Sequence, residues 1–180
     1  FDFLQDNPFD GSFSTVDQTK IISTNSQIVA TSSSFASVLK GAGVSEYDAF
    51  EASFAAFANV TEEKVIDDPS IKLDLSSVSF IADLNNNLVT KNNHSLEVQN
   101  VISAIQTSSM EAIANINYLF SEDSLKSAGD MSFVLSMLDD VSEQLASAAE
   151  SEFSNPGSGE NIITFKSLEV LETEVDDLLN

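Results

Sequence analysis

The spacing of hydrophobic positions changes once along this chain. Between residues 1 and 22, apolar residues alternate with polar ones around the turn formers Pro8 and Gly11. This pattern predicts one or two short strands around a turn. From about Asn25 onward, apolar residues recur every three or four positions, which is the repeat of an amphipathic helix. The sequence therefore predicts one domain, with a β/turn segment over residues 1–22 and a helical bundle over residues 23–180.

Six or seven helices are expected in the second part, each with one apolar stripe that needs a neighbour. The main ones are predicted at 25–41, 45–60, 74–88, 95–119, 130–145 and 167–180. A flexible loop is expected at 154–161, because it is rich in Pro, Gly and Ser, and "IITF" at 162–165 is expected to form a short strand. The predicted fold class is mostly α, a multi-helix bundle with short β segments near the N-terminus and around 162–165.

The helix expected after Ser45 has an unusual aromatic content. Tyr47, Phe50, Phe54 and Phe57 follow one another at 3-4-3 spacing, which keeps their rings on one helical face. Because every other predicted helix has a matching apolar stripe, we expect this aromatic face to lie inside the bundle. The alternative is a groove or surface for a partner.

The charge of the chain narrows its possible partners. It has 29 acidic residues against 7 lysines, no arginine, and a net charge of −22 at pH 7. Nucleic-acid binding needs Lys and Arg to displace phosphate counterions, so a nucleic-acid partner is excluded. Like charges also destabilise a compact state, and salt relieves this repulsion because the screening length falls to ~3 Å near 1 M. We expect a saline or calcium-rich setting, the alternative being that the acidity only maintains solubility.

The residues that usually perform catalysis are scarce. Cysteine is absent, which excludes disulfides, thiolate catalysis and cysteine metal sites. The one histidine, His94, lies in the polar stretch "KNNHS" and is expected on the surface, and one histidine alone cannot build a common zinc site or a catalytic relay. Phosphate-cradling and dinucleotide motifs are also absent. The chain is therefore predicted not to be an enzyme.

Calcium is the sharper prediction for a bound ion. The stretch "DNPFDGSFSTVD" places Asp6, Asp10 and Asp17 at loop positions 1, 5 and 12, with Gly11 at position 6, as in an EF-hand loop. Pro8 departs from this pattern at position 3, because it offers no side-chain oxygen. We therefore name Asp6, Asp10 and Asp17 as candidate calcium ligands, and no other cofactor is expected.

Three short motifs stand in the first part of the chain: Phe9 with Gly11, Gly43-Val44-Ser45 followed by Ala49, and Asp68-Pro69. Through these motifs, residues 1–70 resemble a helical module of large secreted bacterial surface proteins and adhesins. The chain departs from that family where the first helix begins, with "NSQIVATSS" in place of "Pro-Leu-Thr-x-Leu". The resemblance implies an extracellular structural or adhesive context, and it brings no catalytic residues.

These observations together predict a function. The leading prediction is a non-enzymatic structural or assembly module of a secreted, acidic bacterial cell-surface or matrix protein, forming filaments by polymerising through its terminal strands. The alternative is a calcium-dependent adhesion or ligand-binding domain. Partners are expected to be proteins, either other copies of the chain or neighbouring domains. Membrane insertion is not expected, because no stretch approaches ~20 apolar residues. The chain opens with Phe1, and we expect it to be a processed product or part of a longer chain.

Overall fold

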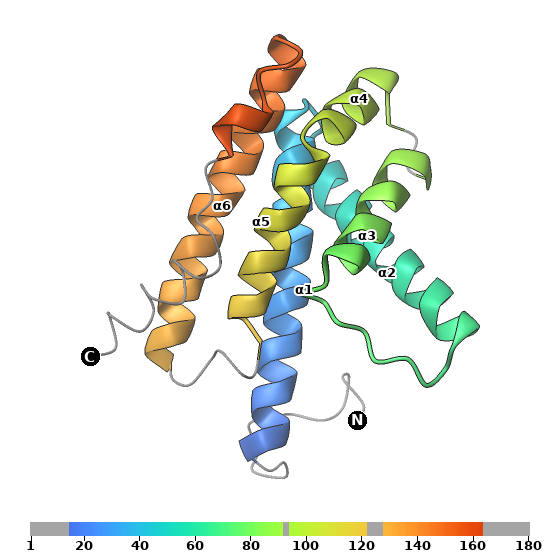
Figure 1. Cartoon of the computed structure of the whole chain (residues 1–180), viewed down its shortest axis with the longest axis vertical. Coiled ribbons are helices and arrows are strands. Elements are labelled where there is room, and N and C mark those ends of the chain that lie inside the picture. Colours follow the sequence, from blue (N-terminus) through green and yellow to red (C-terminus); the bar gives the residue numbers. More distant parts are fainter. Residues whose placement is uncertain (1–14, 92–93, 122–127, 164–180) are drawn as a thin grey trace.

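The computed structural model describes residues 15–91, 94–121 and 128–163, with the backbone alone at 15–17 and 128–133. These residues form six α-helices and a short 3-10 helix, η1 (Figure 1). Their bounds are α1 Thr15–Gly41, α2 Glu46–Asp67, α3 Val78–Lys91, α4 Leu96–Ala104, α5 Gln106–Leu119, α6 Ala128–Ser154 and η1 Glu160–Ile162. The predicted helical bundle is confirmed.

Helix α1 is the central element, with α6 and α5 along its length and α2 and α3 on the other side (Figure 1). Helix α4 lies across the end where α1 and α6 finish. The helices α1 and α6 approach closely at Gly41, where an added Cβ would lie 2.8 Å from the Cβ of Ala149. No real Cβ tolerates such a contact, so only glycine fits this crossing of the two helices.

A buried polar contact fixes the position of α5 against α1. The side-chain amide of Asn117 is fully buried, and its Nδ2 donates hydrogen bonds to Thr31 Oγ1 and to the Leu75 carbonyl, both at 2.6 Å. The backbone carbonyl of Asn117 accepts a further hydrogen bond from Gln27 Nε2 at 2.8 Å. Because buried polar groups are costly when unpaired, these bonds define one register of α5 between α1 and the loop before α3.

The predicted β segments are not seen in the part of the chain that the structure describes. Residues 15–22 were expected in a strand and turn, but they form the start of α1. Their β-branched residues favour strands only weakly, and these residues continue the long helix that packs against α5 and α6. At the other end, Glu160–Ile162 forms a 3-10 helix where the strand at 162–165 was expected to begin. Residues 1–14 and 164–165, which complete these predictions, lie outside the described residues.

The helix predicted at 95–119 is interrupted. Helix α4 ends at Ala104 and α5 begins at Gln106, and the backbone of Ile105 between them has φ −100° and ψ 11°, outside helical geometry. The side chain of Ile105 is fully buried, so the break allows both short helices to direct apolar residues into the core. Ile113, Ile116 and Leu119 are buried, as the repeat of apolar positions predicts, whereas Leu96 is 72% exposed.

The prediction that the aromatic residues of α2 lie in the core is wrong for most of them. Helix α2 packs against α1 and α3 through small side chains and one valine. Its buried residues are Ala49, Ala52, Ser53, Ala56 and Val60. Tyr47, Phe50 and Phe54 are exposed, and only Phe57 turns partly inward, where its ring meets Phe80 of α3 edge-on at a centroid distance of 5.6 Å. Alanine permits a closer approach of neighbouring helices than a ring would, and this closeness decides which face is buried.

Candidate functional site

The exposed apolar surface of α2 is the strongest candidate for a functional site. Helix α2 begins firmly, because the hydroxyl of Ser45 accepts a hydrogen bond from the Asp48 N–H at 3.2 Å and donates one to the Asp48 carboxylate at 2.7 Å. It ends at Asp67, with Asp68 as its C-cap directly before Pro69, and it is longer than the helix predicted at 45–60. The helix is therefore a defined rod of 22 residues, and its side chains have fixed directions.

Four apolar side chains make up this surface, which we call the α2 face: Tyr47, Phe50, Phe54 and Val65. Tyr47 is 77% exposed, Phe54 46% and Val65 43%, and Phe50 is only slightly less exposed. Spacings of 7 and 11 residues bring Tyr47, Phe54 and Val65 onto one line along the helix, and Phe50 lies beside that line. Monomeric proteins seldom expose large apolar residues in such a row, so the α2 face has the character of a contact surface.

Carboxylates border the α2 face. Asp48, Glu51 and Glu62 are exposed, and helical geometry places them along one edge of the apolar line. One lysine of α2 and one of α3 are already engaged: Lys64 pairs with Asp83 of α3 at 2.6 Å, and Lys91 of α3 pairs with Glu63. Among the described residues, no ion pair involves Glu51 or Glu62. The surface is therefore apolar along its centre and negative at its edge.

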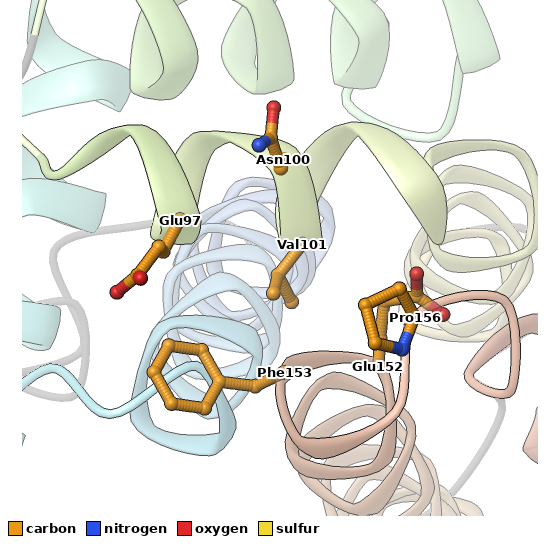
Figure 2. Close-up of a pocket in the computed structure, with 6 residues that line it drawn as sticks. All are labelled: Glu97, Asn100, Val101, Glu152, Phe153 and Pro156. Atoms are coloured by element: carbon orange, nitrogen blue, oxygen red, sulfur yellow. The ribbon is translucent and has the colours of Figure 1, made fainter.

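A hollow lies between α4 and the C-terminal end of α6 (Figure 2). It has a volume of about 400 Å³ and is lined by Glu97, Asn100, Val101, Glu152, Phe153 and Pro156. Figure 2 shows Val101 pointing from α4 toward the α6 end, while Asn100 points away from Phe153. The ring of Phe153 extends to the connection between α1 and α2, where an added Cβ on Gly43 would lie 3.9 Å from its Cζ.

The carboxylate of Glu152, in this hollow, accepts hydrogen bonds from the loop that follows α6. Its Oε1 accepts a hydrogen bond from the Gly157 N–H at 2.8 Å, and its Oε2 accepts one from the Gly159 N–H at 2.9 Å. These two backbone hydrogen bonds, that of Gly157 first, hold the pKa of Glu152 below its ordinary value. Both carboxylate oxygens thus bind backbone N–H groups of the loop after α6. The flexibility expected for residues 154–161 stays a prediction.

Between α2 and α3 lies a polar groove of about 310 Å³ that contains the two ion pairs described above. Its lining includes Glu63, Lys64, Asp83 and Lys91. Because the positive and negative groups pair with each other across the groove, these residues link α2 to α3. The adjacent carboxylates Glu62 and Glu63 do not act as a pair, since they point in different directions on the helix.

The predicted calcium ligands are not brought together in the described part of the chain. Asp6 and Asp10 lie outside it, and Asp17 falls in the first turn of α1, where only the backbone is described. Within residues 15–91, 94–121 and 128–163, no group of three or more acidic or histidine side chains is arranged to hold a metal ion. Calcium binding by Asp6, Asp10 and Asp17 stays a prediction.

His94 is half-buried rather than fully on the surface. Its Nε2 has no hydrogen-bond partner among the described residues, and its backbone carbonyl accepts a hydrogen bond from Gln99 Nε2 at 2.9 Å. Burial lowers the pKa of the His94 imidazole, because the charged form loses hydration. This residue therefore belongs to the packing of the turn before α4.

Comparisons with known proteins give no relative: no family model, no curated protein and no solved structure matches this chain. Among the helices that the structure describes, none is both long and apolar enough to cross a membrane. The candidate site therefore rests on the geometry and chemistry of the chain itself.

The sequence contained a signal for the orientation of α2. Ala49, Ala52 and Ala56 recur at 3-4 spacing on the side opposite Tyr47, so they mark a face suited to close helix packing. Hydrophobicity alone predicts that the aromatic side is buried, because rings bury more apolar area than methyl groups. The size of the residues on each face, and not their hydrophobicity, distinguishes the orientation with buried alanines from the orientation with buried aromatic residues.

Proposed function

We propose that this chain is a non-enzymatic assembly module of a secreted, acidic bacterial surface or matrix protein, and that it binds a protein partner through the α2 face. The observation that supports this most is the inverted arrangement of α2. Its small residues face the bundle, and three of its four aromatic residues, Tyr47, Phe50 and Phe54, face solvent. An apolar row bordered by polar groups is typical of protein contact surfaces.

The two hollows favour a structural role over catalysis. Glu152 uses both carboxylate oxygens to hold the loop after α6, and the charged groups between α2 and α3 pair with each other. The extracellular setting is supported by the acidic composition, which suits a saline medium. Polymerisation through terminal strands stays a prediction, because residues 1–14 and 164–180 lie outside the described part of the chain.

Photo-crosslinking in the organism that encodes the chain tests this proposal. A photoreactive phenylalanine analogue is placed at position 54 on the α2 face, and at position 135 in a matched control, since Leu135 is an exposed apolar residue of α6. We expect a discrete protein adduct from position 54 alone, recovered from the cell surface or the medium.

Two results would contradict the proposal. Equal adduct patterns from positions 54 and 135 would show that the α2 face has no preferred partner. Recovery of the chain and its adduct only from inside the cell would show that the proposed extracellular setting is wrong.

A further inference from the structure

We propose that the partner presents a cationic amphipathic helix to the α2 face, with apolar residues on one side and Lys or Arg beside them. This inference rests on the proposed function and specifies the chemistry of the partner. It follows from three properties of α2: its backbone, the size of its apolar row and the sign of its edge charge.

The backbone of α2 determines the kind of element that can bind. Its N–H and C=O groups are paired within the helix, so the face cannot accept an added strand through main-chain hydrogen bonds. A partner must bind through side chains and must satisfy its own backbone, and a helix meets both conditions. The line from Tyr47 to Val65 spans 18 residues, or about 27 Å at ~1.5 Å per residue, which matches a helix of five turns.

The apolar row alone is too small for a stable interface. From the exposed fractions of Tyr47, Phe50, Phe54 and Val65, the row offers roughly 400 Å² of side-chain surface, since one aromatic residue can bury about 150–250 Å². A standard interface buries about 800 Å² on each partner. Further contacts must therefore come from the polar groups at the border of the row.

These border groups determine the sign of the charge that the partner should carry. Asp48, Glu51 and Glu62 lie along one edge, and the neighbouring lysines Lys64 and Lys91 are paired elsewhere. A partner with Lys or Arg beside its apolar stripe complements this edge and associates faster. A second copy of the chain is disfavoured as the occupant, because it brings a net charge of −22 against the same charge.

A designed peptide tests this inference directly. The probe is a fluorescently labelled 18-residue amphipathic helix of leucine and lysine, and its acidic counterpart has glutamate in place of lysine. Binding to the full chain is measured by fluorescence anisotropy in 0.15 M NaCl. We expect a dissociation constant in the micromolar range for the lysine peptide and no binding of the glutamate peptide.

Two pairs of variants locate the binding. The double variant Tyr47→Ser/Phe54→Ser removes the apolar anchors, and Val29→Ser/Leu135→Ser removes two other exposed apolar residues from α1 and α6. The variant Glu51→Gln/Glu62→Gln removes edge charge, and Asp139→Asn/Asp140→Asn removes the same charge from the exposed side of α6. All eight side chains are exposed, and circular dichroism verifies that each variant retains its helix content.

We expect about tenfold weaker binding from the loss of the aromatic pair and about threefold from the loss of the Glu pair. The two control variants should change binding less than twofold. Equal weakening by test and control variants would overturn the inference, since it would show attraction to net charge alone. Binding of the glutamate peptide, or dimerisation of the chain through the α2 face in light scattering, would overturn it too.

The outcomes also separate this inference from the proposed function. A discrete crosslink at position 54 to a partner without a cationic helix would leave the assembly role standing and overturn the partner chemistry. A lack of any crosslink at position 54, with the lysine peptide still bound at the α2 face, would overturn the assembly role alone.

Discussion

In this molecule, hydrogen bonds from single side chains join helices to each other and to the loops between them. Glu152 joins the end of α6 to the loop that follows it, and Asn117 joins α5 to α1 and to the loop before α3. Glu152 pairs the buried N–H of Gly159, and Asn117 pairs the hydroxyl of Thr31 and the carbonyl of Leu75 inside the core. The stability of the fold is therefore expected to respond to substitutions that change a single atom of these side chains.

At this scale, Glu152→Gln is expected to lower the thermal midpoint by a few degrees at pH 7, because one carboxylate oxygen that accepts a backbone N–H is replaced by an NH₂ donor. The folded pKa of Glu152 lies below the ordinary value of 4.5, so the stability it contributes is present above that pH. This stability is lost as pH falls through the lowered folded pKa. Thermal melts of both proteins from pH 7 to pH 3 should therefore converge at the acidic end.

Glu150→Gln is the matched control for this measurement, since Glu150 lies on the same helix and is exposed. It should melt like the unmodified chain at every pH. A constant difference between Glu152→Gln and the unmodified chain from pH 7 to pH 3 would show that the charge of Glu152 does not stabilise the loop.

At the scale of elements, the crossing of α1 and α6 depends on one missing side chain. Gly41→Ala is expected to reduce the free energy of unfolding by about 1–3 kcal/mol, because the new methyl group would overlap the backbone of Ala146 and the Cβ of Ala149. Elsewhere in a helix the same substitution stabilises by about 0.5–1 kcal/mol. The sign of the change, measured by urea unfolding, therefore reports the close approach directly.

The neighbouring substitution Lys40→Ala provides the comparison for Gly41→Ala. Lys40 is exposed, and its only described ion pair is the distant one to Glu46 at 3.8 Å, so the change should stay within about 0.5 kcal/mol. A stabilising effect of Gly41→Ala would contradict the described crossing of the two helices.

The elements also show which parts of the fold the sequence could predict. Leu84 and Leu88 of α3 and Leu145 of α6 are buried as their spacing predicts, because those helices have one large apolar face and one polar face. Helix α2 has large apolar residues on one face and alanines on the other, and there the prediction chose the wrong face. The break at Ile105 was also missed, since it lies within a continuous apolar repeat without Gly or Pro.

The candidate site was only partly accessible from sequence for the same reason. The pattern placed Tyr47, Phe50, Phe54 and Phe57 on one face, and this grouping is correct for the first three only, because Phe57 turns partly inward. Whether that face points inward depends on how closely α1 and α3 approach α2, which is a property of three helices together. The hydrogen bonds of Glu152 to the glycines of its own loop likewise depend on the path of the chain after α6.

For the whole molecule, the net charge of −22 sets the dependence on salt. We expect the thermal midpoint to rise between 0.05 M and 1 M NaCl, because screening weakens the repulsion among 29 acidic residues. The rise should be smaller for Asp139→Asn/Asp140→Asn, which has two fewer of these charges. A midpoint that stays constant or falls across this range would contradict the role of self-repulsion.

Calcium and magnesium chloride at matched ionic strength separate screening from ion binding in the same melting experiment. Equal rises with both salts indicate screening. A rise specific to calcium, lost in Asp10→Ala, would support the predicted ligands Asp6, Asp10 and Asp17.

The inverted arrangement of α2 has a consequence for how this sequence diverges between species. Ala49, Ala52 and Ala56 are confined by neighbouring helices, so purifying selection on folding alone retains small residues there. Packing within the bundle places less constraint on Tyr47 and Phe54, which are both exposed. In orthologues, aromatic residues that persist at these two positions would record selection for an interface, and drift toward Lys, Glu or Ser would record its loss.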